Sequence, residues 1–384
     1  MPILHFSDAE LKSRQLAARK AMQDLKLDGL LMFRQESMYY LTGYDTSGYT
    51  MFQGMLLTAD GKSALLTRPI DRIQCLTTSI VEDLRIWVDS DDANPALDLK
   101  KMLRDHGMEG KTVGLEYHAY GLTGQRSKMV EAALDGFCTL VDASDLVRVL
   151  RLVKSPEELK YVRKAGELCD RMVGISIERC RPGVSTRAIV GDMYQALISG
   201  GGDPPASRWP FGAGEMALLC RYHTGEETIA ARDQVFFEPG ASYRYYHACT
   251  MYNIVVGQCS PLQRQMHQAC ADAIDACQDA LRPGRTIGEV FDIHKKVLTD
   301  AGFADASMSA CGYTMGAMYP PTWMDWPMFW TGNPQIIDAG MVFFLHMILF
   351  DKQNGISVSL GETAIVTDKA CERITHIPRG VIEV

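Results

Sequence analysis

Two side chains that could take part in hydrolysis lie close together in the chain: the carboxylate of Glu238 and the imidazole of His247. Apolar, strand-like runs stand on either side of them at 235–237 and 254–256, and the segment between is rich in tyrosine. We expect one β-hairpin that carries both side chains at strand or strand-edge positions. A carboxylate can attack an electrophilic carbon and an imidazole can transfer a proton, so the pair predicts nucleophilic and acid–base chemistry.

The composition is that of an ordinary globular protein. The chain has 384 residues, of which 47% are hydrophobic and 22% charged, enough for two domains. The net charge of -8 and the lack of a lysine or arginine cluster argue against nucleic-acid binding. There is no signal-peptide core and no apolar run long enough to cross a membrane. The eleven cysteines are scattered and form no Cys-x-x-Cys pair, which predicts free thiols in the cytoplasm.

Residues 1–150 are predicted to form a first, smaller domain. Ser7 and Glu10 have the spacing of a capping box, ahead of an amphipathic helix that continues to about Leu25. Helical segments then alternate with strand-like runs at 29–33, 54–57, 63–66, 84–87 and 112–115. This alternation predicts a three-layer α/β domain.

Residues 151–384 have a different pattern. A second capping signal, Ser155 to Glu158 with Pro156 at the first helical position, begins a long helix. Helices are expected at about 156–178, 185–199, 261–281 and 286–302, and the tail reads as a strand, a turn at Asn354-Gly355 and a strand. Helices grouped around an antiparallel sheet predict an α+β domain.

Four segments of this second part resemble, in order, the motifs of the pita-bread family, which includes methionine aminopeptidase, prolidase, aminopeptidase P and creatinase. The segments are Glu238-Pro239-Gly240-Ala241 with Cys249 eleven residues on, Gly312 to Gly316, Gly340 to His346, and Gly361-Glu362-Thr363. The resemblance covers roughly residues 155–370. It implies a C-terminal pita-bread domain behind a creatinase-like N-terminal domain, a small-molecule substrate and a homodimer.

The resemblance also shows which residues stand where the family's peptidases bind metal. The five ligand positions correspond to Glu238, Cys249, Tyr313, His346 and Gly361. A pair of divalent ions needs several carboxylates to bind it and to neutralise its charge, and this set offers one. Glu362 is a neighbouring carboxylate, but the alternation of side chains along a strand would turn it to the other face of the sheet. We therefore expect no metal and no other cofactor.

One branch of the family fits these residues better. Tyr246-His247-Ala248, the run from Gly312 to Trp323 and the segment Tyr40 to Asp45 resemble ectoine hydrolase, which opens a cyclic amidine. The resemblance implies a nucleophilic glutamate, which would be Glu238. An amidinium carbon already carries positive charge, so a carboxylate can both bind it and attack it without a metal. Aromatic side chains concentrated at 319–330 would favour a planar cation.

We therefore predict a metal-independent hydrolase of a carbon–nitrogen bond in a small cationic compound. Glu238 is the predicted nucleophile and His247 the base or acid, and His346 is either a proton carrier or a packed core histidine. Aromatic residues 319–330 could line a pocket or a dimer interface. The predicted substrate-binding residues are His223, Tyr313, Tyr319, Trp323, Tyr44 and Glu362. The alternatives are an Xaa-Pro dipeptidase-like or creatinase-like hydrolase, and a non-catalytic relative that binds a solute or a partner protein.

Overall fold

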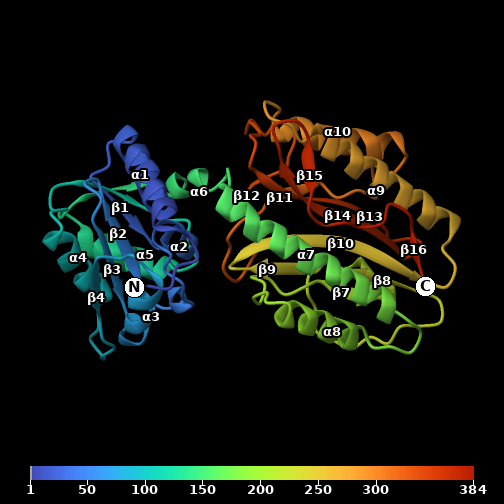
Figure 1. Ribbon diagram of the computed structural model, residues 1–384, viewed down its shortest axis with the longest axis horizontal. Coiled ribbons are helices and arrows are strands. Elements are labelled where there is room, and N and C mark those ends of the chain that lie inside the picture. The colour runs from blue at the N-terminus through green and yellow to red at the C-terminus, as the bar shows by residue number, and fades with distance from the viewer. Residues whose placement is uncertain (1) are drawn as a thin grey trace. The chain divides into compact units, whose positions relative to one another are not determined.

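The computed structural model describes residues 2–384, and the chain forms two compact units, Met1–Arg151 and Leu152–Val384 (Figure 1). Unit 1 contains one six-stranded mixed sheet in the order β4-β3-β2-β1-β5-β6. Its strands are β1 (Gly29–Met32), β2 (Gly54–Thr58), β3 (Ser63–Thr67), β4 (Asp83–Ile86), β5 (Thr112–Leu115) and β6 (Thr139–Asp142). Its helices are α1 (Asp8–Asp24), α2 (Gln35–Thr42), α3 (Arg72–Thr78), α4 (Pro95–Asp105), α5 (Gly124–Leu134) and α6 (Leu146–Leu150).

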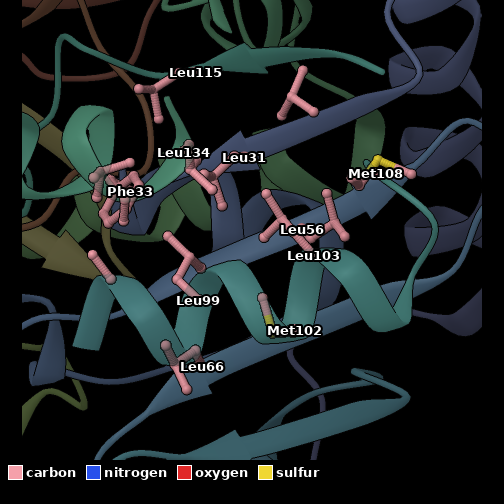
Figure 2. Packing of buried hydrophobic residues seen from close by; sticks show 14 of the residues in the cluster. Leu31, Phe33, Leu56, Leu66, Leu99, Met102, Leu103, Met108, Leu115 and Leu134 are labelled. Carbon is pink, nitrogen blue, oxygen red and sulfur yellow. The ribbon is translucent and has the colours of Figure 1, made fainter. Parts of the chain in front are cut away.

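Alternate residues of the unit 1 strands enter two separate apolar clusters. Leu31 and Leu56 pack with Leu99 and Met102 of α4 in one cluster, as Figure 2 shows. Leu30 and the neighbouring alternate residues pack in the other cluster, with side chains of α1, α2 and α6. Because successive side chains of a strand point to opposite faces, the two clusters lie on the two faces of the sheet. Unit 1 is therefore a three-layer α/β domain, as predicted.

Unit 2 is built on one ten-stranded sheet, which is mostly antiparallel. Seven strands run in the order β12-β11-β13-β14-β10-β8-β7, and β9, β15 and β16 pair beside this path. The strands are β7 (Phe211–Ala213), β8 (Asp233–Phe237), β9 (Gly240–Tyr243), β10 (Tyr246–Val256), β11 (Gly312–Thr314), β12 (Asp325–Met328), β13 (Val342–Asp351), β14 (Ile356–Val366), β15 (Cys371–Arg373) and β16 (Ile382–Glu383). The helices are α7 (Pro156–Arg179), α8 (Thr186–Ser199), α9 (Pro261–Ala280) and α10 (Ile287–Asp300).

The long helices pack on one face of this sheet. Helix α7 lies against β9 and β10, and α9 lies against β13 and β14 (Figure 1). The capping box of Ser155 and Glu158 begins α7, and a second one at Thr286 and Glu289 begins α10. Side chains that point to the opposite face of the sheet are available to form a site.

The predicted hairpin is a group of three strands. The turn at Arg244 and Tyr245, both with positive φ, joins β9 to β10, and β10 pairs first with β9 and then with β8. Pro239 lacks an amide hydrogen, and the chain leaves β8 just before it. Glu238 therefore stands at the break between β8 and β9 rather than within a strand.

Candidate functional site

A cavity of about 930 Å³ opens in unit 2, and all of its lining residues belong to that unit. Its floor comes from residues of β10, β11, β12 and β13 that point away from α7 and α9, and its rim from loops at 204–210, 220–222 and 320–324. Of the predicted site residues it brings together four, which are Glu238, Tyr313, Trp323 and His346. Five others do not line it: His223, His247, Tyr319, Glu362 and Tyr44.

Glu238 is the one carboxylate among the lining residues. Its side chain is 7% exposed, and no described residue donates a hydrogen bond to its carboxyl group. Burial disfavours the charged form and raises the pKa of Glu238 to about 8, although Arg221 acts in the opposite direction. A carboxyl group with such a pKa gives up its proton readily when a positive charge enters the cavity. Perturbed groups of this kind in a cleft are typical of functional sites.

Arg208 and Arg221 add positive charge to the same cavity. Neither guanidinium forms an ion pair with a carboxylate of the described residues, and Arg208 lies over the ring of Tyr222 at 5.3 Å. Arginine binds carboxylates through paired hydrogen bonds. The cavity thus offers one acidic group and two basic ones, a combination suited to a ligand that carries both charges.

Tyr313 and Trp323 form a hydrogen-bonded pair beside Glu238. The indole nitrogen of Trp323 donates to the Tyr313 hydroxyl oxygen at 2.8 Å, which leaves the tyrosine proton able to donate to a ligand. Burial first of all, and then the charge of Glu238, raise the pKa of Tyr313 well above its usual value. Gly240 makes room for the indole, since a Cβ there would meet the ring at 3.0 Å. Tyr313 is therefore a neutral hydrogen-bond donor at the cavity wall.

His346 lies on β13 in the cavity floor, directly opposite Gly361 of β14. It is 8% exposed, and its Nδ1 has no hydrogen-bond partner among the described residues. Burial lowers the pKa of His346 to about 4, with a smaller contribution from His294. The imidazole is therefore neutral near pH 7 and has the form of a base rather than an acid.

His247 lies away from the cavity. Its Nε2 accepts the backbone N–H of Ala206 at 3.0 Å, and its Nδ1 lies 3.5 Å from the Gly316 carbonyl oxygen. Burial lowers the pKa of His247 to about 4. With both nitrogens engaged by the backbone, the ring holds the loop that contains Ala206, which does line the cavity. This placement does not support the predicted role of His247 as base or acid and favours a positioning role.

Glu362 was predicted to bind substrate, but the structure places it on the helix face of the sheet. Its fully buried carboxylate accepts hydrogen bonds from Arg373, Arg379, Gln278 of α9 and the Ile377 amide. Burial alone would raise the pKa of Glu362, but the hydrogen bonds from the two arginines hold it below its usual value. All of its bonding capacity is used inside the protein, so Glu362 is structural.

The remaining three predicted residues, Tyr44, Tyr319 and His223, do not line the cavity either. Tyr44 is fully buried in the apolar cluster of unit 1, so it is a core residue and not part of an exposed loop. Tyr319 stacks on Tyr245 with ring centroids 4.0 Å apart. His223 Nε2 lies 3.1 Å from the Glu227 carboxylate, and it is the preceding residues, 220–222, that face the cavity. None of the three is placed to bind a ligand in this cavity.

The donor set does not fit a two-metal centre. Among residues 2–384 no group of three or more histidine, cysteine, aspartate or glutamate side chains could hold a metal ion. Of the five positions that correspond to peptidase ligands, Cys249 does not line the cavity and Gly361 has no side chain. A Cβ on Gly361 would meet the Phe344 ring at 2.8 Å and the Met251 Cβ at 2.9 Å. Apolar groups thus fill the space of a ligand side chain.

Together, the three-layer first unit and the ten-stranded second unit define a two-domain hydrolase of the pita-bread class. The Creatinase/Prolidase N-terminal domain model matches residues 14–153, and the Metallopeptidase family M24 model matches residues 160–368. The chain belongs to metallopeptidase family M24. The predicted family and fold class are thereby confirmed.

Relatives and solved structures agree with this assignment. An uncharacterized hydrolase/peptidase of Sinorhizobium fredii is 28% identical over 100% of this chain and 99% of its own. Ectoine hydrolase of Halomonas elongata is 25% identical over 98% of each chain. The crystal structure of dipeptidase PepE from Mycobacterium ulcerans has a TM-score of 0.84 at 23% identity and covers 99% of each chain, which shows the shared fold. No helix within residues 2–384 is long and apolar enough to span a membrane.

Sequence reasoning did not identify Arg208, Arg221 or Tyr194 as cavity residues. The two arginines lie on loops and match no motif. The spacing of Cys220-Arg221-Tyr222-His223 did direct attention to this segment, but to its histidine.

Proposed function

We propose that this protein is a metal-independent hydrolase that cleaves a carbon–nitrogen bond in a small cationic substrate, with Glu238 as the nucleophile. The observation that carries the proposal is the isolation of Glu238: a buried carboxyl group, the one acid in the cavity, without a hydrogen-bond donor from the described chain. Such a group is costly to ionise alone, but a bound cation would stabilise its anion. The relationship to ectoine hydrolase makes a cyclic amidine the first substrate to test.

The reaction would proceed in two steps. The Glu238 carboxylate attacks the amidinium carbon and forms a carbon–oxygen bond. One carbon–nitrogen bond then breaks, and the departing amine takes a proton from the other nitrogen, which becomes the imidate nitrogen. Water then attacks the resulting acyl-imidate ester, which releases the amide product and restores the carboxylate. The neutral imidazole of His346 is suited to accept a proton from that water. Tyr313 is suited to donate a hydrogen bond to the substrate.

Arg208 and Arg221 support a zwitterionic substrate in particular. A carboxylate on the substrate would bind to the two guanidinium groups while its amidinium group binds to Glu238. Ectoine carries both charges. A dipeptide also carries both, which keeps an Xaa-Pro dipeptidase activity as the second candidate, but the donor set offers no means of holding the metal pair that polarises a peptide carbonyl.

The test is incubation with ectoine, creatine and a Gly-Pro dipeptide, followed by mass spectrometry of the products and of the intact protein. We expect ectoine to be opened and an adduct to form on Glu238, both lost in Glu238→Gln and both kept in the control Glu215→Gln, an exposed residue outside the cavity. Cleavage of Gly-Pro alone, with stoichiometric metal by elemental analysis, would refute the proposal. Binding of ectoine without turnover, and unaffected by Glu238→Gln, would indicate a solute-binding relative.

A further inference from the structure

Five apolar residues of the cavity lining are not used by the proposed chemistry. They are Met251, Met308, Met324, Met328 and Ile348, here called the methionine wall. The Met308 amide lies 3.4 Å from the Ile348 carbonyl oxygen, and Met328 stands opposite Tyr313 in the sheet. The five side chains come from β10, β12 and β13 and from two loops around the cavity.

The methionine wall differs from ordinary core packing. Met308 is 40% exposed, and Met324 and Met328 are half-buried, although methionine gains most from complete burial, whereas Met251 and Ile348 are buried. Ligand sites range from about 300 to about 1,000 Å³, and this cavity of about 930 Å³ lies near the upper limit. A small ring bound at Glu238 would leave much of that space to water against apolar side chains. An additional apolar group on the ligand would cover them.

The register of the sheet sets where the wall meets Glu238. Tyr252 pairs with Phe237, and the Thr250 amide donates to the Pro239 carbonyl oxygen at 3.0 Å, so Met251 stands opposite Glu238. Met251 is also directly opposite Gly361, which in turn is opposite His346. A carbon atom bonded to the Glu238 carboxylate would therefore have Met251 as its neighbour on this side.

We propose that the methionine wall binds an alkyl substituent on the carbon that Glu238 attacks. The substrates would be amidines whose amidine carbon carries a chain longer than methyl, and the products would be the corresponding longer-chain amides. This inference rests on the proposed function, because it takes Glu238 as the group that binds the amidine. It adds that the wall selects the length of the acyl group in the product.

The test measures affinity by calorimetry for two straight-chain series, from acetamidinium to hexanamidinium and from acetamide to hexanamide. Burial of each added methylene is expected to tighten binding about fourfold in both series. The difference in affinity between an amidinium ligand and the amide of the same length reports on Glu238. Measuring whether Glu238→Gln abolishes this difference tests the proposed function. The gain with chain length reports on the methionine wall, so the two hypotheses can fail separately.

Variants test whether the gain in affinity with chain length depends on the methionine wall. Met308→Gln combined with Met324→Gln is expected to reduce the gain to less than about twofold per methylene, because each substitution replaces apolar contact with a polar amide. Met216→Gln, at an exposed methionine outside the cavity, is the matched control and should keep the full gain. Affinity independent of length in both series would overturn the inference. An equal gain in the double variant and in the control would also overturn it.

Discussion

Unit 2 contains two buried glutamates with opposite surroundings. Glu238 lies on the cavity side, where no described side chain or amide donates a hydrogen bond to it, and its pKa is raised to about 8. Glu362 lies on the helix side, where Arg373 and Arg379 surround it and hold its pKa below the usual value. Both glutamates are buried, so their hydrogen-bond partners decide whether the pKa is raised or lowered. A buried carboxylate with arginine partners stabilises the fold, whereas one without partners is available to a ligand.

The largest effect that would sharpen this contrast is on catalysis. Glu238→Gln should lower kcat by about a thousandfold or more, as expected when a nucleophile is removed. The same variant should be as stable as the native protein or more stable at pH 7, because folding no longer has to neutralise a buried acid. Turnover of ectoine and urea denaturation measure the two quantities. A stable variant with native activity would contradict the role of Glu238.

The second effect is on stability. Glu362→Gln should lower the free energy of unfolding by about 3 kcal/mol, because it leaves two arginines and an amide hydrogen without their charged acceptor. Urea denaturation at pH 7 measures it, and Glu372→Gln, in an exposed pair with Arg163, is the control with little expected change. The activity per folded molecule should stay within a few-fold of native. A loss of activity as large as that of Glu238→Gln would contradict the structural role of Glu362.

The third effect is the pH dependence, which has opposite signs at the two sites. Between pH 4.5 and about 8, folded Glu238 keeps a proton that the unfolded chain has lost, so this residue makes stability fall as the pH rises. Glu362 has a lowered pKa, so its contribution is present above the unfolded pKa and is lost as the pH falls through the folded one. Urea denaturation should show the Glu238 slope removed in Glu238→Gln between pH 4.5 and 8, and the Glu362 slope removed in Glu362→Gln below pH 4.5.

Catalysis should follow Glu238 and not Glu362. The value of kcat/KM reports the free enzyme, so it should rise with pH up to about 8 as the attacking carboxylate loses its proton. A profile that is flat from pH 5 to 8 would contradict a protonated Glu238 in the empty cavity. Glu362→Gln should leave the shape of the profile unchanged.

Much of the fold could be predicted because its signals are local. Ser155 with Pro156 defines a helix start that the structure reproduces as α7, and the helix expected at about 286–302 is α10. The antiparallel pair β13 and β14 follows from the turn at Asn354-Gly355. Each of these signals lies within a few residues of the element that it defines, so no knowledge of distant contacts is needed.

The site was harder to predict because its partners are distant in the sequence. Strand alternation indicated that Glu362 turns away from the cavity, but Arg379 and Gln278, which bind it there, could not be foreseen. The roles predicted for His247 and Tyr44 depended on exposure that the structure does not give them. Glu238 was predicted from its position in a motif, and the structure places it at the break between β8 and β9. Motif position thus led to Glu238, the one carboxylate of the cavity lining, better than it led to the residues around it.

The smallest effects come from one arginine beside each glutamate. Arg221→Gln removes a charge that lowers the pKa of Glu238, so it should move the kcat/KM profile to higher pH by a fraction of a unit and leave stability nearly unchanged, since Arg221 is exposed. Arg379→Gln should cost about 2 kcal/mol of stability through its lost hydrogen bond to Glu362 and leave the profile in place. The pH dependence of kcat/KM and urea denaturation of both variants measure the two quantities. An exchange of the two outcomes would mean that Glu362, and not Glu238, is the carboxylate that limits the reaction.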